Sequence, residues 1–503
     1  MGKNDLSLLK ELAEVVTKNK VKSVDILSNK DANGRTFDFY ERILNDSFKS
    51  DQEAAEFYFD KESQYPQYRK LKNKLKEKLI NTAFFVDVNS PKFNTHQKAF
   101  YTCQKNLMAV RILIGRYARK PAIQLALDTL KKSIKYELPE ISLELCRLLR
   151  SHYATQSKNE SAYRKYSNLA SFYQKNAAAE DLAISRYEHT SILMRKSTRN
   201  QIVIELCDNY CEELKPFTKE FTSFRLNLWY YFIAIRGASL KKDHKKVIAL
   251  CNEAISFLSS KGFVSSHFIG ALYYQKLTSL IQKKDFVTAR DVSQKCVSIF
   301  EENTIRWYSA HGFSFQFAMH SGQFRKALNI REKVVNSEAF HKQFQNREES
   351  WRLNDAYLYY LYLRGKLNIP KSSGITSFRI KKFLNEVPTF SMDKSGYNIP
   401  ILIIQILIQI HHKKYDQLTD KIEAIEKYTS RYLRKENNYR SNCFIKMLLQ
   451  MPKQHFHRVA VERHTKTLLA KLKSMPLAKA NQPFEIEIIP YENLWLMARE
   501  SLG

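Results

Sequence analysis

Apolar side chains recur every three or four residues along most of this 503-residue chain, a spacing that places them on one face of an α-helix. Residues 268–283 show the pattern with Leu272, Leu277 and Leu280, and residues 304–321 repeat it. The pattern predicts further helices, joined by short polar segments, at residues 100–115, 121–136, 139–152, 161–175, 178–195 and 201–214. Only 12 glycines and 12 prolines interrupt the chain, against average usage of roughly 7% and 5%. This deficit favours long helices over a fold of strands and turns.

A short motif recurs at the start of several predicted helices. It occupies residues 244–247, 286–289, 324–327 and 415–418, which start 42, 38 and 91 residues apart. The last interval is about two units, so the period is about 40 residues, the length of a helix, a turn and a second helix. An aromatic residue opens the motif and packs against the first helix, and a compact residue three positions later lets the backbones approach. These repeat-packing residues are Phe286, Ala289, Phe324, Ala327, Tyr415 and Leu418, with Gly322 in a turn where a positive φ is commonly needed.

Residues 284–289 and 322–327 resemble the inter-helix turn of a tetratricopeptide repeat, since a small or polar residue, an aromatic residue and an alanine follow in the same order. The resemblance covers residues 225–342 well and residues 399–433 moderately. The unit is longer than the family's repeat of about 34 residues, and the tryptophan and glycine of the family's first helix are mostly missing. In the first copy, histidine and valine replace the aromatic residue and the alanine. The resemblance implies an all-α fold, a divergent α-solenoid of antiparallel helix pairs with an extended groove.

These patterns divide the chain into segments. We expect an N-terminal helical region (1–95), helical pairs (96–224), tetratricopeptide-like repeats (225–367), a loop or hinge region (368–398), C-terminal helix pairs (399–480), and a strand with a capping helix (481–503). Short strand-like segments are predicted near the two ends, at residues 83–88 and at residues 484–488, where apolar and acidic residues alternate. A lone strand needs a pairing partner, so the second segment pairs either with the first or with another chain.

The chain is strongly basic. Its 82 Lys and Arg residues against 51 Asp and Glu give a net charge of +31, which attracts nucleic acid, anionic lipid or an acidic protein. The basic residues are spread along the whole sequence, which also fits lysines that are merely solvated. Both interpretations stay open at this point.

Cysteine usage and hydropathy indicate a cytoplasmic protein. The seven cysteines have no paired spacing and are typical of buried thiols in a reducing compartment. The first 20 residues contain acidic positions and no continuous apolar core, so no signal peptide is expected. The most apolar run, residues 399–410, is about half of the roughly 20 residues that cross a bilayer, and Gln405 and Gln409 interrupt it. We therefore expect no transmembrane segment.

The sequence carries no recognisable enzyme motif. No two glycines lie close enough for a phosphate-binding or dinucleotide-binding turn, and no G-x-S-x-G elbow occurs. Cys207 and Cys211 are four residues apart, but no second Cys/His pair stands at zinc-module spacing. His457 and His464, with Glu462, form another histidine grouping that is more typical of a solvated helix face. We expect no catalytic residues, no cofactor and no metal site.

Two basic helices are candidate partner-binding surfaces. Residues 68–80 place Leu71, Leu75 and Leu79 on one face, surrounded by lysines. Residues 455–473 form the second basic helix. The residues that we expect to contact a partner are Lys70, Lys74, Lys78, Arg458, Arg463 and Lys466. For the first helix, the leucines are also the stripe that any amphipathic helix turns toward a core.

The leading hypothesis is a non-catalytic cytoplasmic scaffold or adaptor that binds an acidic protein or peptide in its solenoid groove. The alternative is a nucleic-acid-associated protein, in which the basic surface contacts phosphates and exposed aromatic rings stack on bases. A peptide-sensing regulator would need a DNA-binding headpiece, and residues 6–27 are too weakly patterned to supply one. The terminal helices either cap the array or mediate self-association.

Overall fold

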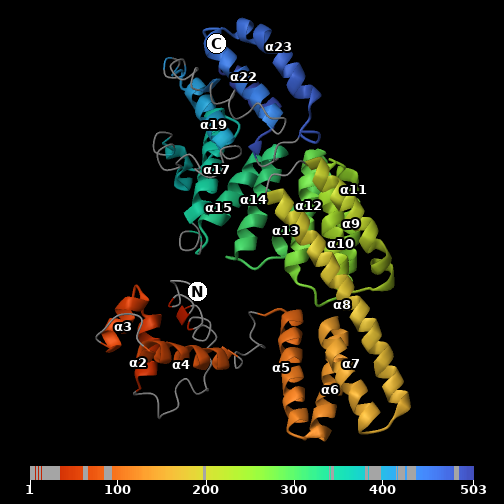
Figure 1. The fold of residues 1–503 in the computed structure, drawn as a ribbon. Coiled ribbons are helices and arrows are strands. Elements are labelled where there is room, and N and C mark those ends of the chain that lie inside the picture. Colours follow the sequence, from red (N-terminus) through yellow and green to blue (C-terminus); the bar gives the residue numbers. More distant parts are fainter. Residues whose placement is uncertain are drawn as a thin grey trace. The chain divides into compact units, whose positions relative to one another are not determined.

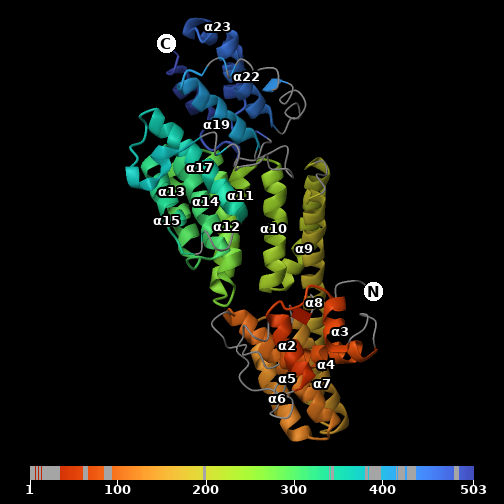
Figure 2. The same cartoon turned by 90° about the vertical axis from the view of Figure 1, so that its left-hand side faces the viewer.

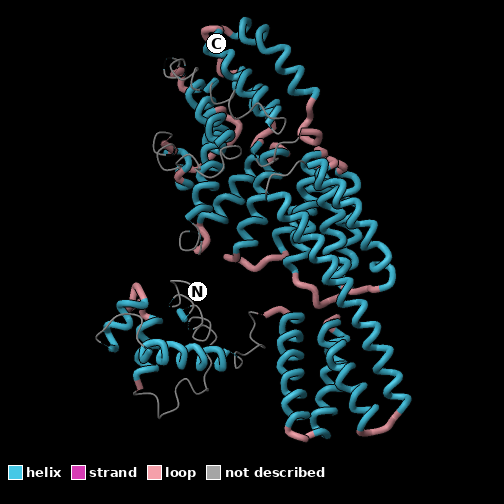
Figure 3. The backbone as a smooth tube through the Cα atoms, viewed as in Figure 1, coloured by secondary structure: helices cyan, strands magenta, loops and turns pink. Residues whose placement is uncertain are grey.

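The protein is all-helical in the part of the chain that the computed structural model describes. The described residues are 6, 9–10, 13, 34–59, 66–83, 93–195, 200–338, 340, 345–379, 383, 398–414, 416, 418, 425–426, 438–480 and 486–502. They form α-helices and short 3-10 helices, and none of them lies in a strand (Figure 3). The all-α prediction is therefore confirmed for these residues. The chain divides into two compact units, residues 1–177 and 178–503, which we describe separately.

The first unit begins with a small cluster of helices. The unit contains α2 (Arg35–Leu44), α3 (Asp51–Phe59), α4 (Pro66–Ala83), α5 (Thr95–Gly115), α6 (Arg119–Lys135), α7 (Pro139–Thr155) and the first part of α8 (Glu160–Arg195). Phe39 of α2 and Leu75 of α4 are fully buried in one apolar core. Asp51, at the start of α3, accepts a hydrogen bond from the Tyr68 hydroxyl (2.6 Å) and pairs with Lys72 Nζ (2.8 Å). This polar contact fixes the start of α3 against α4.

Helices α5, α6 and α7 form a second core in the first unit, where they lie side by side (Figures 1 and 2). Asn94 and Gln97 make reciprocal hydrogen bonds between side chain and backbone that cap the start of α5. Leu145 and Cys146 of α7 are fully buried between the helices. Burial raises the pKa of the Cys146 thiol to about 12, so this cysteine stays a protonated, apolar filler of the core.

The second unit is a succession of helices, each packed against the next. It contains the rest of α8, then α9 (Asn200–Glu220), α10 (Phe224–Leu240), α11 (His244–Ser260), α12 (Ser266–Gln282), α13 (Phe286–Ser298), α14 (Ile305–His320), α15 (Phe324–Val335), α17 (Gln345–Leu363), α19 (Asn398–His411), α22 (Tyr439–Lys453), α23 (Arg458–Ser474) and α24 (Tyr491–Arg499). From α9 to α15 every helix contacts its successor, and α12 also contacts α14 (Figure 1). Neighbours in sequence are therefore neighbours in space.

One turn geometry recurs between the helices of the second unit. A backbone N–H after each turn donates to the carbonyl five residues earlier, and the residue before that N–H has a positive φ. This is the Schellman arrangement, which satisfies carbonyls left free at a helix end. The donors are Asp243, Asp285, Gln323, Lys366, Lys414 and Phe456, at intervals between 38 and 48 residues. In two copies the aspartate also caps the next helix, because Asp243 accepts from the Lys246 N–H and Asp285 from the Thr288 N–H.

The turn at Lys366 lies within the 91-residue interval that the sequence pattern indicates to be about two units. Gly365 supplies the positive φ of 63°, but the chain continues into two 3-10 helices, Lys371–Ser373 and Ile375–Ser377, instead of an α-helix. The described part of the predicted loop region is thus a compact pair of 3-10 turns, with Ile375 buried.

The C-terminal segment packs onto helices from the middle of the chain. His244, at the start of α11, lies 3.0 Å from the carbonyl oxygen of Ala478. His320, at the end of α14, lies 2.6 Å from the carbonyl oxygen of Glu487. Next to Ala478 in the sequence, Leu477 joins a buried cluster with Leu277 and other residues of α12, α13 and α14. The described residues 475–480 and 486–490 therefore cover the turn end of these helices.

The strand predicted at residues 484–488 is wrong for its described part. Ile486 to Ile488 form an irregular segment, and Glu487 is fully buried instead of facing solvent. Arg440 binds both Glu487 (2.7 Å) and Glu492 (2.9 Å), and it donates to the carbonyls of Leu472 and Met475. A charged partner from α22 thus replaces the strand pairing that the alternation suggested. Of the other predicted strand, residues 83–88, Ala83 is the last residue of α4, and residues 84–88 lie outside the described residues.

Candidate partner-binding surfaces

The predicted repeat residues of the second unit take packing positions. Ala289 and Ala327 are fully buried, and Phe286 and Phe324 are partly buried against apolar clusters. The Phe286 ring lies 6.4 Å from the ring of Phe317 on α14, so it also contacts the helix that follows. Gly322 has a φ of 73°, Leu418 is buried, and Tyr415 lies outside the described residues. These side chains pack the helices against one another, so other residues must bind a partner.

On α4 the predicted row of leucines packs into the core of the first unit. Leu71, Leu75 and Leu79 are buried against α2 and α3, so they do not form a lipid-facing surface. Lys70 and Lys74 are exposed, and Lys78 is half-buried. The helix therefore presents lysines but no apolar face to a partner.

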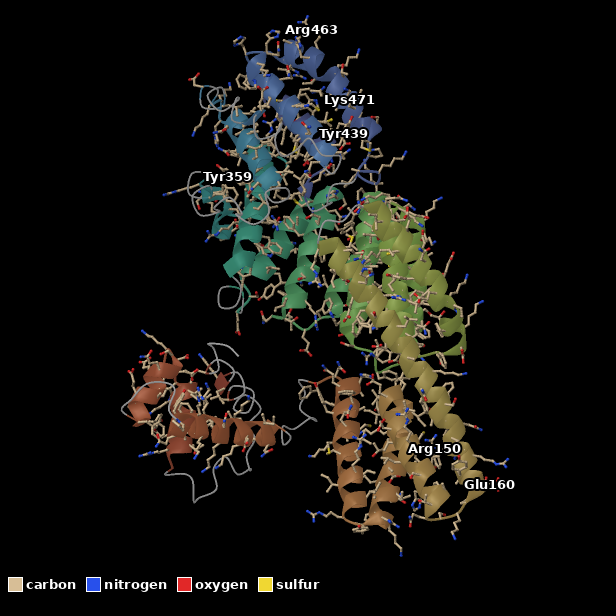
Figure 4. The ribbon with its side chains drawn as sticks, in the orientation of Figure 1. Arg150, Glu160, Tyr359, Tyr439, Arg463 and Lys471 are labelled. Atoms are coloured by element: carbon tan, nitrogen blue, oxygen red, sulfur yellow. The ribbon has the colours of Figure 1, made fainter. Side chains whose placement is uncertain are left out.

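On α23 the predicted basic residues differ in their surroundings. Arg458 pairs with Glu462 (3.3 Å), which also lies 3.6 Å from Arg499. Arg463 and Lys466 are exposed and make no ion pair with a described residue. Figure 4 marks Arg463 and Lys471 on this helix. Arg458 is thus neutralised locally, whereas the positive charges of Arg463 and Lys466 face solvent.

Helix α22 extends this basic surface, which the sequence pattern did not reveal. Burial raises the pKa of the Cys443 thiol, while its hydrogen bond with Tyr439 and the nearby charges of Lys446 and Lys471 oppose the rise. The two lysines and Tyr439, which is 38% exposed, therefore lie around Cys443 at the junction of α22 and α23. We call Lys446, Arg463, Lys466, Lys471 and Lys473 the α22–α23 basic surface. All five are exposed, and none makes an ion pair with a described residue.

Acidic residues are almost absent from this helix pair. Residues 439–480 contain nine lysines and arginines and a single acidic residue, Glu462, which already contacts Arg458 and Arg499. Like charges on adjacent turns repel, and the repulsion falls when an anion binds. The scarcity of acidic residues at 439–480 is visible in the sequence, but the packing of α22 against α23, which brings their lysines together, is a tertiary contact.

Neither thiols nor histidines form a metal centre in the described part of the chain, where no three His, Cys, Asp or Glu side chains lie close enough to hold an ion. Burial raises the pKa of Cys207 to about 11 and that of Cys211 to about 12, so both thiols stay protonated at neutral pH. His457 caps α23, with its Nδ1 accepting from the Ala460 N–H. No described helix is long and apolar enough to span a membrane.

Comparisons with protein-family models, with curated proteins and with solved structures gave no match to this chain.

Proposed function

We propose that this chain is a non-catalytic cytoplasmic scaffold whose helix pairs stack as a divergent tetratricopeptide-like solenoid and bind an acidic protein or peptide. Support for the stacking comes from the recurrent Schellman turn and from the contact of each helix between α9 and α15 with its successor. Repeated helix pairs of this kind offer an extended binding surface without further loops. Several such helix pairs together form one binding surface.

The proposal of an acidic partner rests on one observation: none of the five residues of the α22–α23 basic surface pairs with an acidic residue in the described part of the chain. Its five basic side chains are exposed, and Glu462 is already occupied. Desolvated charge pairs across an interface steer association and fix its register. A carboxylate-rich segment is the protein ligand that complements this surface.

Nucleic acid is the second candidate, and Tyr439 favours it. Tyr439 hydrogen-bonds with Cys443, and the charges of Lys446 and Lys471 also act on that thiol. The ring is 38% exposed, so a base can stack on it while phosphates meet the lysines. Such stacking is worth about 1–3 kcal/mol per base when an aromatic residue is replaced by alanine.

Fluorescence polarisation with a labelled oligoglutamate peptide and with labelled single-stranded DNA tests both candidates. We expect the variant with Arg463→Glu, Lys466→Glu and Lys471→Glu to lose at least about tenfold in peptide affinity, since several charge pairs are lost. The matched control carries Lys158→Glu, Lys165→Glu and Lys175→Glu, three exposed lysines of the first unit with no assigned binding role, with the same change in net charge. Equal losses in the two variants would show that binding follows net charge alone and would contradict the proposal.

The measurement with labelled DNA distinguishes the two candidate ligands. If DNA is the ligand, its affinity falls by orders of magnitude between about 50 and 200 mM salt, and Tyr439→Ala weakens DNA binding but leaves peptide binding unchanged. If DNA binds no better to the native chain than to the α22–α23 variant, the nucleic-acid candidate is excluded.

A further inference from the structure

A cavity lies between α11 and α13, with α12 as its floor. Its volume is about 370 Å³, within the range of roughly 300–1,000 Å³ that small-molecule sites occupy. Asn252 comes from α11, Tyr273 and Lys276 from α12, and Thr288 and Lys295 from α13. Successive helices of the second unit therefore bring two ammonium groups and several polar groups to one hollow.

The two lysines have no acidic partner among the described residues. Neither Lys276 nor Lys295 makes a hydrogen bond or ion pair with a described residue, although Asp291 also lines the cavity. Burial lowers the pKa of Lys276, and the neighbouring charge of Lys295 lowers it further, against an opposing contribution from Cys251. Two like charges near each other in a partly enclosed space cost free energy that a bound anion would offset.

We propose that this cavity is a binding site for a phosphate monoester, a site separate from the α22–α23 basic surface and independent of the proposed scaffold function. A phosphate monoester carries about −1.5 to −2 charges at pH 7 and offers three acceptor oxygens. Lys276 and Lys295 match that charge. The amide of Asn252 and the hydroxyls of Thr288 and Tyr273 supply uncharged donors.

Asp291 affects which phosphate monoester the cavity can bind. Its carboxylate repels an anion, so the cavity keeps a net positive charge smaller than the two lysines alone would give. The same carboxylate accepts a hydrogen bond from a hydroxyl or amide N–H on the body of the ligand. A monoester with such a donor beside its phosphate therefore fits better than a bare phosphate ion.

The test is isothermal titration calorimetry of the full chain with glycerol phosphate and, separately, with a short peptide that contains one phosphoserine. We expect saturable binding of one ligand per chain, stronger at pH 7.5 than at pH 5, because the second ionisation of the phosphate has a pKa of about 6. Tighter binding of the peptide would identify a phosphorylated partner as the source of the group. Tighter binding of glycerol phosphate would identify a free metabolite.

Three variants assign the binding to this cavity. Lys276→Met and Lys295→Gln each lower the affinity about tenfold or more, as expected for a lost charge-assisted hydrogen bond, whereas Asp291→Asn raises it. Lys295 is exposed, so its variant keeps the test valid if Lys276→Met does not fold. The matched control is Lys245→Gln, an exposed lysine of α11 outside the cavity.

Two results would overturn the proposal. One is the absence of saturable binding of either probe to the native chain. The other is an equal loss of affinity in Lys245→Gln and Lys295→Gln, which would show that the phosphate responds only to the overall positive charge of the protein.

Discussion

His320 is the residue whose titration most directly links pH to stability. Its side chain is fully buried at the end of α14, and its Nε2 lies 2.6 Å from the carbonyl oxygen of Glu487. Burial lowers its pKa to about 4, with the charges of Arg440 and Lys284 acting in the same direction and Glu492 opposing them. At neutral pH the ring is therefore uncharged, and it donates its Nε2 proton to that carbonyl.

We predict that the second unit loses stability as the pH falls from about 7 to 4. The unfolded chain binds a proton at the ordinary histidine pKa of about 6.5, before the folded chain does, so protons favour unfolding. The lowered pKa of His320 corresponds to a loss of roughly 3 kcal/mol in the free energy of unfolding across this pH range. Urea unfolding at several pH values measures the effect, and His320→Gln should flatten the dependence. An unchanged slope in that variant would contradict the assignment to His320.

At the scale of the elements, the turn between two helices repeats more faithfully than the helices themselves. Lys284 and Gly322 occupy the same position in consecutive turns, with φ values of 60° and 73°. Glycine adopts this left-handed conformation freely, whereas a residue with a Cβ adopts it at a cost. The lysine is therefore tolerated because the hydrogen bonds of the turn hold the backbone in place.

Glycine in place of Lys284 and alanine in place of Gly322 should change the free energy of unfolding in opposite directions. We expect Lys284→Gly to stabilise the second unit by up to about 1 kcal/mol and Gly322→Ala to destabilise it by about 1 kcal/mol or more. A Cβ on Gly322 would meet no atom within 4 Å, so the loss comes from the backbone conformation alone. Chemical denaturation of both variants provides the measurement. A loss of stability in Lys284→Gly would show that the lysine side chain contributes more than its backbone strain costs.

At the scale of the whole molecule, hydrogen bonds between residues far apart in sequence connect the C-terminal segment of the second unit to its middle helices. The hydrogen bond between His320 and Glu487 spans 167 residues, and that between His244 and Ala478 spans 234. Arg440 adds two buried or partly buried carboxylate contacts, with Glu487 and Glu492. The C-terminal segment thus ties the last helix pair to helices from the middle of the chain.

Removing this segment should therefore destabilise helices that precede it by more than 150 residues. A chain that ends at Ser474 leaves the Arg440 guanidinium buried without its carboxylates, a change that typically costs about 3–5 kcal/mol. We expect hydrogen exchange to accelerate in α11 and α14 as well as in α22. Glu487→Gln, which keeps the side-chain volume, should give a smaller loss. Unchanged exchange in α11 and α14 after truncation would contradict this coupling.

Local patterns predicted much of the helical fold and part of the candidate site. The apolar period predicted α12 and α14, and the short motifs predicted the turns before Phe286 and Phe324. The sequence predicted the end of the repeats at residue 367 but did not identify the repeat turn at Lys366, because no apolar helix pattern follows it. Arg463 and Lys466 were expected to contact a partner, but Lys446 and Tyr439 were not, because their grouping with Lys471 depends on the packing of α22 against α23. Lys276 and Lys295, which pair with no described residue, come from two different helices, and no pattern within one helix reveals that they share a cavity.

The sequence by itself determined that this chain forms helices and where many of them turn back, because helix periodicity and turn conformation depend on residues a few positions apart. Only the tertiary structure decided that Glu487 is buried beside Arg440 instead of alternating outward in a strand. It also decided which lysines share a cavity and which face solvent. Those outcomes depend on desolvation and on charges brought together from distant positions, and neither quantity can be computed from local spacing.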